Sequence, residues 1–430
     1  MNALKKMSPG RFIALGFAAV ILLGAFILYL PISHNEGVDV AFMDAVFTST
    51  SAICVTGLMV VDTYDTYNAF GQTVIALLIQ VGGLGVTSIG VGIMLLARRK
   101  VDFKDRVLLK ETLNLESMRG VVKLIRSVLL MTLGFELVGA VLSFFVFSRD
   151  YPLLRAVGIS LFHSIAAFNN AGFDNLGGFK NLLDYHDNIL LNLTTSGLML
   201  SGGLGFVVIK ELFYKRSFKK LSLHAKVVIV MTSGLIVAGT ILLKLTEGMS
   251  WLGAFFFSTS SGTAGFITYP VSGFTNAGLF IIIILMYIGS SPGSTGGGIK
   301  TTTAFVLFKS AYAASANKHC SAFKRKIPAE IQTKAFMLAF LAMVVICFNT
   351  LLLSIMEPGY NFIQILFEVV SAFGTVGFSI GITSELKPIS EVIIILTMYI
   401  GRVGPLTIAS IWSVKPLSGL RYSEEGLMIG

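Results

Sequence analysis

The chain has 430 residues, of which 54% are hydrophobic and only 13% are charged. Soluble domains carry about 25% charged residues, so the composition excludes an ordinary soluble protein and indicates a chain whose main solvent is lipid. The formal net charge of +10 is then a sign of membrane topology and not of nucleic-acid binding, and the three cysteines have no paired or metal-ligand spacing.

Apolar runs along the chain predict eight membrane-spanning helices, because about 20 apolar residues cross the hydrocarbon core. The first run follows basic residues as a secretory signal would, but no small-residue cleavage site is evident and more spans follow, so we expect a retained helix. The runs are Phe12–Leu30, Gly71–Ala97, Val121–Phe147, Ile189–Phe213, Val227–Leu245, Gly278–Ile288 (continued in broken form to Tyr312), Lys334–Ile355 and Val392–Trp412.

The distribution of Lys and Arg predicts the orientation of these spans. With eight spans both termini lie on one side, and 26 of the 33 basic residues fall on that side. Basic residues near helix ends stay cytoplasmic, so we expect both termini in the cytoplasm. The opposite face is rich in acidic residues such as Asp39, Asp44 and Asp62. Their field would concentrate cations at a pore mouth, although simple solvated acidic loops are an alternative.

Four segments of the chain align without gaps. In each, a Phe stands ten residues before a Gly, small or hydroxylated residues fill the middle, and a large apolar residue follows. Each segment lies between two spans on the expected outer side, after a stretch of about a dozen residues that is too short to span. The repeating unit is therefore span, half-helix, extended loop and span. The segments are Phe47–Leu58, Phe162–Phe173, Phe255–Phe266 and Phe367–Phe378.

Four extended loops at membrane depth must line a water-filled cavity or be buried in protein, because lipid cannot satisfy their backbone groups. Arranged around one axis, they would form a ring of carbonyls able to replace the hydration shell of a monovalent cation. Glycine reaches positive φ, and half-helices aim partly negative ends at the axis. The predicted filter segments are Val55, Thr56 and Gly57; Asn170, Ala171 and Gly172; Thr263, Ala264 and Gly265; and Thr375, Val376 and Gly377.

The second span of each unit also repeats, as Leu78–Gly85, Leu198–Gly205, Leu285–Pro292 and Thr397–Gly404. In units one and two, the small residues are explained by close helix packing. In unit three, the stretch 289–303 contains Gly, Ser, Thr and Pro in the middle of the span and should be unwound. We interpret it as a mobile gate; an ordinary kinked helix is the alternative, and a phosphate loop is disfavoured because Ile299 stands where Lys is needed. The gate candidates are Gly293, Ser294, Thr295, Gly296, Gly297, Gly298 and Lys300, the last as a positive barrier.

Arg402 is the other basic residue within an apolar span, where charge is costly and indicates function. It corresponds to Ser290 of unit three and should lie below the filter segments, bound to carbonyls of the unwound loop. A structural tie to Glu136 or to helix carbonyls is the alternative. We expect Cys54 to pack, and His163 and Glu368 to hydrogen-bond inside the protein.

At these residues the chain resembles the Trk/Ktr/HKT superfamily of K⁺ transporters, and most of all the membrane subunit of bacterial Ktr K⁺ uptake systems. The resemblance implies an all-α membrane fold of four M1–P–M2 repeats, with eight transmembrane helices and four re-entrant pore helices around a pseudo-four-fold pore. It also implies selectivity at the four glycines and an intramembrane gating loop in repeat three. The motifs that carry it span nearly the whole chain: Ile79–Gly85, Phe168–Phe173, Ser371–Gly377, Tyr399–Leu406 and Arg421–Tyr422.

The resemblance further implies K⁺ uptake that is often Na⁺-dependent, a bacterial plasma membrane, and a homodimer with one pore per subunit. A cytosolic nucleotide-binding ring would regulate it, and no cofactor is expected beyond the transported K⁺, or Na⁺. The basic loops 98–110, 210–226 and 318–326 would dock this ring, or reflect topology alone. The expected divisions are repeat 1 at 1–98, repeat 2 at 121–215, repeat 3 at 227–312 and repeat 4 at 334–413, with cytoplasmic loops at 99–120, 216–226 and 313–333 and a tail at 414–430.

Two other classes of function compete with a cation pore. A secondary transporter would show broken helices at inverted-repeat positions, whereas these four units run in one orientation. An intramembrane enzyme would need clustered His, Cys or carboxylate groups within the spans, where Glu136 and Arg402 are almost alone. We therefore expect a transport protein and no catalytic residues.

Overall fold

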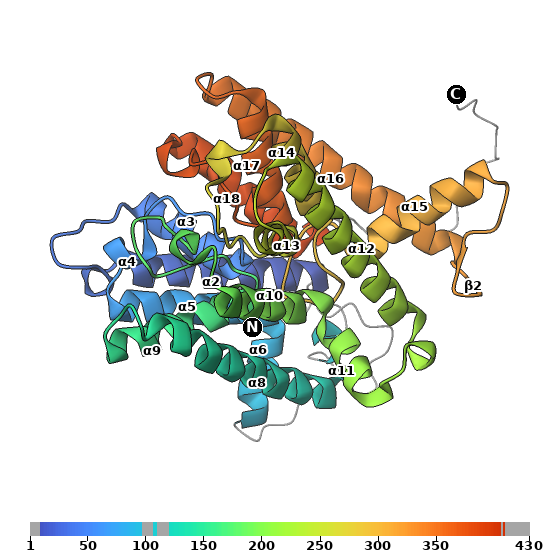
Figure 1. Ribbon diagram of the computed structural model, residues 1–430, viewed down its shortest axis with the longest axis horizontal. Coiled ribbons are helices and arrows are strands. Elements are labelled where there is room, and N and C mark those ends of the chain that lie inside the picture. Colours follow the sequence, from blue (N-terminus) through green and yellow to red (C-terminus); the bar gives the residue numbers. More distant parts are fainter. Residues whose placement is uncertain (1–8, 97–105, 110–119, 406, 409–430) are drawn as a thin grey trace.

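Four copies of one helical unit follow each other along the chain in the computed structural model, which describes residues 9–96, 106–109, 120–405 and 407–408 (Figure 1). Each unit has a long first helix, a half-helix, an extended loop and a second helix. The first helices are α2 (Pro9–Tyr29), α8 (Val121–Phe147), α12 (Leu223–Thr246) and α16 (Ala329–Met356). The half-helices are α3 (Phe42–Cys54), α9 (Leu153–Phe168), α13 (Trp251–Ser260) and α17 (Phe362–Gly374). The second helices are α5 (Ala69–Leu84), α10 (Ile189–Leu204), α14 (Asn276–Tyr287) and α18 (Pro388–Val403).

Shorter elements connect these helices. Three helices continue the second helices of the first three units: α6 (Val86–Leu96), α11 (Phe206–Lys215) and α15 (Thr301–Ser315). A hairpin of β1 (Ser321–Ala322) and β2 (Arg325–Lys326) joins α15 to α16, with Ser321 opposite Lys326. The remaining short helices are α4 (Thr63–Thr66), η1 (Pro31–Ser33), η2 (Leu183–Tyr185), η3 (Phe218–Lys220), η4 (Val271–Gly273) and η5 (Thr383–Glu385). The expected C-terminal tail and most of the loop 99–120 lie outside the described residues.

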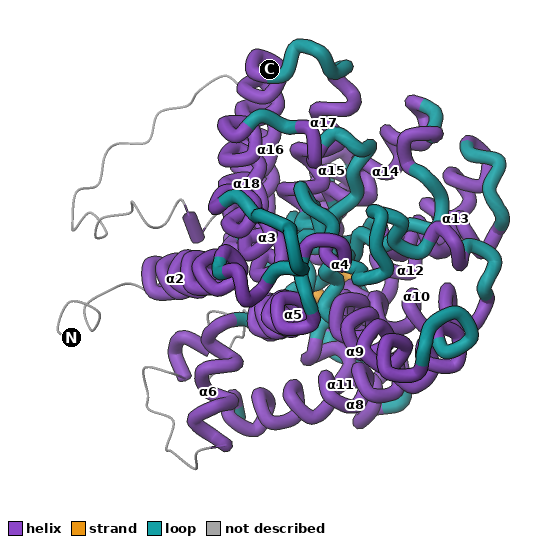
Figure 2. Tube along the Cα trace, turned by 90° about the vertical axis from the view of Figure 1, so that its left-hand side faces the viewer, coloured by secondary structure: helices purple, strands orange, loops and turns teal. Residues whose placement is uncertain are grey.

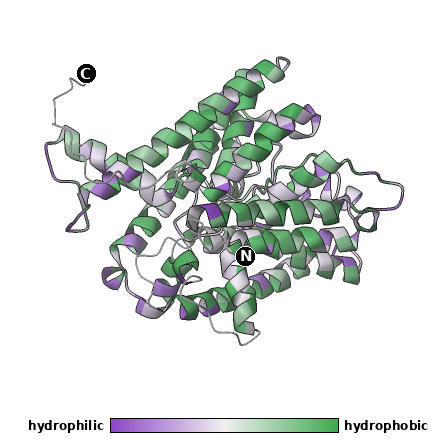
Figure 3. Cartoon of the chain, turned by 180° about the vertical axis from the view of Figure 1, so that it is seen from behind, coloured by the Kyte–Doolittle hydropathy of each residue, from purple (hydrophilic) through white to green (hydrophobic). Residues whose placement is uncertain are grey.

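The chain is a multi-pass membrane protein. Within the described residues, four helices, the first helix of each unit, are long and apolar enough to cross a membrane, and six spans result if two bent helix pairs each count as one. Hydrophobic residues dominate the long helices, whereas hydrophilic residues gather in the connections (Figure 3). The two further spans expected from the sequence correspond to α14, which has 12 residues and ends in the unwound stretch, and to α18, which has 16.

Two spans that we expected to be continuous, Gly71–Ala97 and Ile189–Phe213, are bent. The axes of α5 and α6 differ by 99°, and those of α10 and α11 by 101°. The breaks occur at Gly85 (φ 84°, ψ 136°) and Gly205 (φ 86°, ψ 141°), conformations that end a helix and that glycine adopts at little cost. Close packing of helices is therefore an incomplete explanation of the small residues in units one and two. Gly404 ends α18 in the same way, with φ 94° and ψ 134°.

The four units close into a ring. Within a unit, each half-helix packs on the first helix of that unit, as in the pairs α2–α3 and α8–α9. Between units, each second helix packs on the half-helix of the next unit, in the pairs α5–α9, α10–α13, α14–α17 and, closing the circle, α18–α3. Extended loops gather near the centre of this arrangement, surrounded by helices (Figure 2).

One packing motif recurs within the half-helices of the first three repeats. In repeat one, Ser49 Oγ donates to Ile21 O at 2.7 Å, and a Cβ on Gly24 would lie 2.5 Å from that Oγ. The hydroxyl can reach the first helix only because Gly24 has no side chain. Repeats two and three use the same geometry, with Ser164 donating to Glu136 O beside Gly139 and Ser258 donating to Ile236 O beside Gly239.

Repeat four has a different contact in place of this motif. Val369 stands at the place of the serine, and Asn349 of α16 donates through Nδ2 to Thr397 Oγ1 of α18 at 2.7 Å. Both side chains are buried, and a buried amide needs such a partner. The four units are therefore alike in backbone path but not in the chemistry of their contacts.

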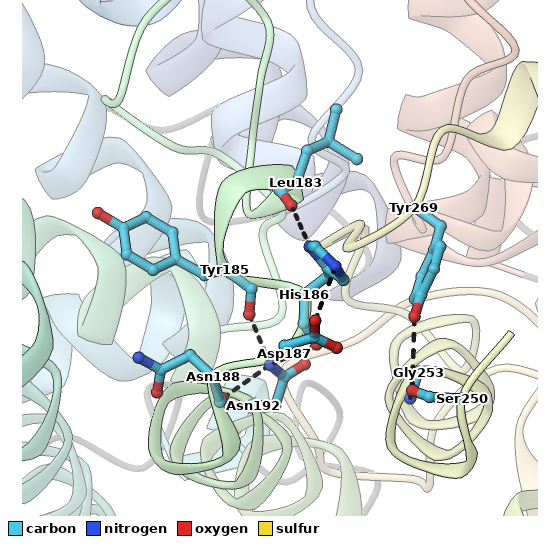
Figure 4. A network of polar contacts seen from close by, with 9 residues as sticks. All are labelled: Leu183, Tyr185, His186, Asp187, Asn188, Asn192, Ser250, Gly253 and Tyr269. Atoms are coloured by element: carbon cyan, nitrogen blue, oxygen red, sulfur yellow. Dashed lines mark hydrogen bonds and ion pairs between the residues drawn. The ribbon is translucent and has the colours of Figure 1, made fainter.

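The outer loop of repeat two is held in place by local hydrogen bonds (Figure 4). Asn192 Nδ2 donates to the carbonyls of Tyr185 and Asn188, at 2.9 Å and 2.8 Å. The ring of His186 lies 5.6 Å from that of Tyr269 in repeat three. The ring contact joins the outer parts of repeats two and three.

Candidate functional site

The glycine of each predicted filter segment has positive φ: 91° at Gly57, 69° at Gly172, 76° at Gly265 and 92° at Gly377. L-amino acids with a side chain rarely adopt these angles, so the backbone of the four segments requires glycine here. The segments of repeats one and four follow directly after α3 and α17, whereas one residue separates α9 from the segment of repeat two and two residues separate α13 from that of repeat three. The partly negative ends of four half-helices therefore point toward the four segments.

The four glycines form a closed ring of contacts. A Cβ added to Gly57 would lie 2.4 Å from the carbonyl oxygen of Ala171, and one added to Gly172 would lie 2.8 Å from that of Ala264. A Cβ added to Gly265 would lie 2.2 Å from Val376 O, and one added to Gly377 would lie 2.1 Å from Thr56 O, which closes the ring. Each glycine thus faces the carbonyl just before the next glycine, and no side chain fits between them.

The amide groups of the segments bond back to the half-helices. Thr56 N–H donates to Ser51 O at 2.8 Å, and Gly57 N–H donates to Ser51 Oγ at 3.0 Å. Val376 and Gly377 repeat these two bonds to Ser371, at 2.9 Å and 3.1 Å. The N–H groups of these two segments are therefore used within their own repeats, whereas in repeat two the carbonyl of Gly172 accepts from Asn181 Nδ2 at 3.2 Å.

The ring is not four-fold in detail. Val55, Asn170 and Thr375 have left-handed backbones with φ of 57°, 58° and 51°, which is costly for β-branched Val and Thr. In repeat three, Thr263 is outside this conformation, because α13 ends at Ser260 and continues in a turn. Such strain persists only where surrounding structure holds it, and it is common at functional sites.

Two cavities flank the region of the filter segments. The outer cavity has a volume of about 360 Å³ and is lined by all four ring glycines together with residues that follow them, such as Leu58 and Ser379. The inner cavity has a volume of about 410 Å³ and is lined by Gly83, Gly85, the stretch 292–300 and Arg402 among others. The walls of both cavities also carry larger apolar side chains, such as Phe17 in the inner cavity and Phe179 in the outer one.

The chain between α14 and α15 is unwound, as its glycines predicted. Ile288 and Ile299 pair as in a parallel bridge, and the loop between them returns on itself. Two of its glycines are required by packing. A Cβ on Gly296 would lie 2.4 Å from Thr263 Oγ1, and one on Gly297 would lie 2.5 Å from Thr375 Oγ1. The loop therefore lies directly against the filter segments of repeats three and four.

The loop is bonded to repeat two as well. Ser291 N–H donates to Gly203 O at 3.1 Å, and Thr295 N–H donates to Gly202 O at 3.2 Å. The Asn170 side-chain amide and Thr295 Oγ1 form a hydrogen bond of 2.8 Å, which joins the loop to a filter segment. Gly297 N–H donates to Thr375 Oγ1 at 2.9 Å and makes the same connection in repeat four.

Both intramembrane cations contact this loop. Lys300 Nζ donates to the carbonyls of Gly296 and Gly297, at 2.6 Å and 3.2 Å. Arg402 donates through Nη1 to Thr295 O and through Nη2 to Gly82 O and to Gly83 O, the last at 3.3 Å. Arg402 thus contacts a loop carbonyl and helix carbonyls at the same time. The expected bond to the unwound loop and the alternative tie to helix carbonyls are therefore both present.

A tie between Arg402 and Glu136, the other alternative, is wrong. Glu136 Oε1 instead accepts from Asn169 Nδ2 at 3.1 Å, and Asn169 also donates to Gln80 Oε1 at 2.9 Å. The hydrogen-bond donors of Arg402 are satisfied by backbone carbonyls because the side chain lies beside the break after α5.

Three further residues were expected to pack or to hydrogen-bond inside the protein. Cys54 is buried. His163 bonds Thr195 Oγ1 at 2.9 Å, and Glu368 accepts from Ser379 and Thr383, so both residues hydrogen-bond inside the protein as expected.

Sequence reasoning missed several contacts of this site. Gly82 and Gly202 carry carbonyls that bind Arg402 and the loop, and Cβ atoms on them would lie 2.1 Å and 1.9 Å from the carbonyls of Ile53 and Phe168 at the ends of half-helices. Their alignment in the second spans was visible, but which carbonyl they would meet was not.

Comparisons with known proteins give the family and the fold of this chain. Residues 16–234 and 223–418 match the family model described as TrkH, cation transport protein. The potassium/sodium uptake protein NtpJ of Enterococcus hirae is 38% identical over 444 residues, 99% of this chain and 98% of that protein. Ktr system potassium uptake protein B of Bacillus subtilis is 35% identical, over 99% of this chain and 97% of its own length. The crystal structure of the potassium transporter TrkH from Vibrio parahaemolyticus matches with a TM-score of 0.76, covering 95% of this chain and 86% of that one, and at 16% identity it shows the fold.

Proposed function

The chain belongs to the TrkH family of cation transport proteins, and from this premise we propose that it takes up K⁺ across a bacterial plasma membrane. Family membership makes it a transporter and not an enzyme. The path proposed for K⁺ rests on one observation, the closed ring of Gly57, Gly172, Gly265 and Gly377 with a cavity on either side. K⁺ is favoured because one relative at 35% identity is named as a potassium uptake protein and one at 38% as a potassium/sodium uptake protein.

In this proposal the twelve residues of the filter segments bind dehydrated K⁺ through their carbonyl oxygens. Carbonyl rings can replace the hydration shell of a cation, and the four half-helix ends add partly negative charge toward the axis. Neither the carbonyl oxygens nor the half-helix ends would stabilise an anion. The left-handed backbones at Val55, Asn170 and Thr375 are consistent with carbonyls held in place before the ion arrives.

The gate in this proposal is the unwound loop with Lys300 and Arg402. It lies against the filter segments of three repeats and lines the inner cavity, so an ion leaving the segments inward would meet it first. Arg402 bonds a loop carbonyl and two carbonyls of α5. Release of these bonds would let the loop move away from the path, which would open the pore.

The remaining features are proposed from the family relation. A cytosolic nucleotide-binding ring would control the loop, in keeping with a relative named as part of a Ktr system. The protein would act as a homodimer with cytoplasmic termini and one pore per subunit, within the repeat boundaries given above. It would hold no cofactor beyond transported K⁺, or Na⁺, and Na⁺ would stimulate uptake, as the name of the potassium/sodium uptake relative suggests.

The test is growth of a K⁺-uptake-deficient bacterium at low K⁺, with this chain expressed alone and together with a Ktr regulatory subunit. We expect growth to be restored, and Rb⁺ uptake into proteoliposomes to be competed by K⁺ more strongly than by Na⁺. For substitutions of the ring glycines, Gly37→Ala serves as the control variant, because Gly37 has positive φ but nothing within 4 Å of an added Cβ. Failure of uptake in both strains, with the protein present in the membrane, would refute K⁺ transport.

A further inference from the structure

A buried carboxylate in repeat four has one oxygen without a partner. Glu368 of half-helix α17 is only 1% exposed. Its Oε1 accepts from Ser379 Oγ and, at 3.1 Å, from Thr383 Oγ1, but its Oε2 makes no hydrogen bond to the described residues. An isolated carboxylate in such a place costs several kcal/mol unless a cation or further donors compensate it.

The three oxygen atoms of this cluster lie close together. Thr383 Oγ1 is also 2.9 Å from Ser379 Oγ, so Glu368 Oε1, Ser379 Oγ and Thr383 Oγ1 form a small triangle. Two hydroxyl hydrogens are shared among these three contacts, because each hydroxyl has one hydrogen. The cluster therefore has more acceptor capacity and negative charge than its own donors satisfy.

The charged groups nearby have partners of their own. Glu357 accepts from Lys387 N–H at 3.0 Å and lies 3.5 Å from Lys387 Nζ. Glu385 accepts from Tyr360 OH at 2.8 Å. Lys387 thus compensates Glu357, and the contacts of these groups supply no cation to Glu368.

The cluster borders an open cavity. Ser379 and Thr383 line the outer cavity that contains the four ring glycines. A cation in the outer cavity can therefore reach the hydroxyls with the carboxylate directly behind them. A small void of about 10 Å³ on the other side of Glu368 has an apolar wall and offers an ion no ligands.

We propose that Glu368, Ser379 and Thr383 form a binding site for a small monovalent cation, Na⁺, at the wall of the outer cavity. Carboxylate and hydroxyl oxygens suit a hard cation. One buried carboxylate matches a single positive charge, and oxygens about 3 Å apart suit an ion smaller than K⁺. The site rests on the proposed function and locates the place where Na⁺ would act to stimulate K⁺ uptake.

The site is connected to the filter segment of its own repeat. Ser379 stands two residues after Gly377, and Glu368 lies on the half-helix that ends at that segment. Repeat one lacks the chemistry: Thr48 and Met59 stand at the two positions, and Thr63 Oγ1 meets the Met59 sulfur at 3.4 Å. Na⁺ bound in repeat four would hold α17 and the chain after Gly377 together, which would stabilise the carbonyl ring for K⁺.

The first experiment measures Na⁺ binding to the purified full-length chain by ²³Na NMR line broadening, at saturating K⁺ so that K⁺ occupies the filter segments. Wild type should bind Na⁺ with saturation. Glu368→Gln should raise the half-saturating Na⁺ concentration about tenfold or more, because it removes the charge from a charge-assisted contact. Ser379→Ala provides a second variant, with a smaller rise expected, should Glu368→Gln fold poorly.

The matched control is Glu385→Gln, which removes a negative charge from the same outer surface outside the cluster and should bind Na⁺ as wild type does. The second measurement is the Na⁺ dependence of Rb⁺ uptake in cells, where the cluster variants should lose stimulation and the control should retain it. Absence of saturable Na⁺ binding to wild type, or equal binding by wild type and both cluster variants, would overturn the site. Absence of Rb⁺ uptake with Na⁺ binding intact would instead count against the proposed function alone.

Discussion

A methyl group at one ring glycine should disrupt the carbonyl ring without unfolding the protein. In Gly57→Ala, the new Cβ would lie 2.4 Å from Ala171 O and 3.0 Å from Gly172 Cα. Ordinary contacts begin at 3.4 Å, so the carbonyl of Ala171 must move by about 1.0 Å, the difference between 3.4 and 2.4 Å. Bound geometry must be kept within about 0.5 Å for a site to work, so this displacement exceeds the tolerance.

The strain of positive φ must be separated from this clash. Ala in a left-handed backbone costs about 1–2 kcal/mol wherever it occurs. Gly37→Ala carries that cost too, since Gly37 has φ 79°, but nothing lies within 4 Å of its added Cβ. The two variants therefore share the backbone cost, and only Gly57→Ala moves a carbonyl of the ring.

The assay is Rb⁺ uptake into proteoliposomes, with the ratio of Rb⁺ to Na⁺ uptake measured in parallel and folded protein quantified by size-exclusion chromatography. We expect Gly57→Ala to lose about 10- to 100-fold in Rb⁺ uptake and to lower the Rb⁺ to Na⁺ ratio, with Gly37→Ala close to wild type. Equal uptake and equal selectivity in wild type and Gly57→Ala would refute the reasoning from the ring.

Three further predictions concern the loop and the outer surface. Arg402→Ala should raise cation flux, because it removes the bonds to Thr295 O and Gly82 O; unchanged flux in this variant and in a chain shortened within 293–298 would contradict the gate. Thr295→Val should also raise flux, since it keeps the volume but removes the bond to Asn170, worth about 1 kcal/mol; flux equal to wild type at fixed K⁺ would argue against it. Burial alone would raise the pKa of Glu357, but hydrogen bonds from Lys387 and Ser390 and the Lys387 charge bring that pKa below its ordinary 4.5. Its stabilising effect should be present above pH 4.5 and be lost as pH falls through the lower folded pKa, so Glu357→Gln should flatten thermal stability against pH below 4.5.

Much of the fold could be predicted because it repeats. The Phe and Gly ten residues apart identified four units, and the short stretch before each Gly identified half-helices of about a dozen residues. The half-helices α3 and α17 have 13 residues each, α9 has 16 and α13 has 10. The bends after α5 and α10 could not be predicted in the same way. Gly85 and Gly205 stand among other glycines, and small residues in a span favour close packing as well as breaks.

The sequence by itself determined the membrane class, the four-fold repetition and the positions where only glycine is tolerated, because these depend on local composition and on backbone angles. Tertiary structure alone decided which groups meet. The close approach of Gly377 to Thr56 O brings repeat four against repeat one. Arg402 likewise donates to Gly82 O, 320 residues away in the sequence. Nothing local to either residue encodes its partner, since such contacts arise only when four units pack around one axis and bring their loops together.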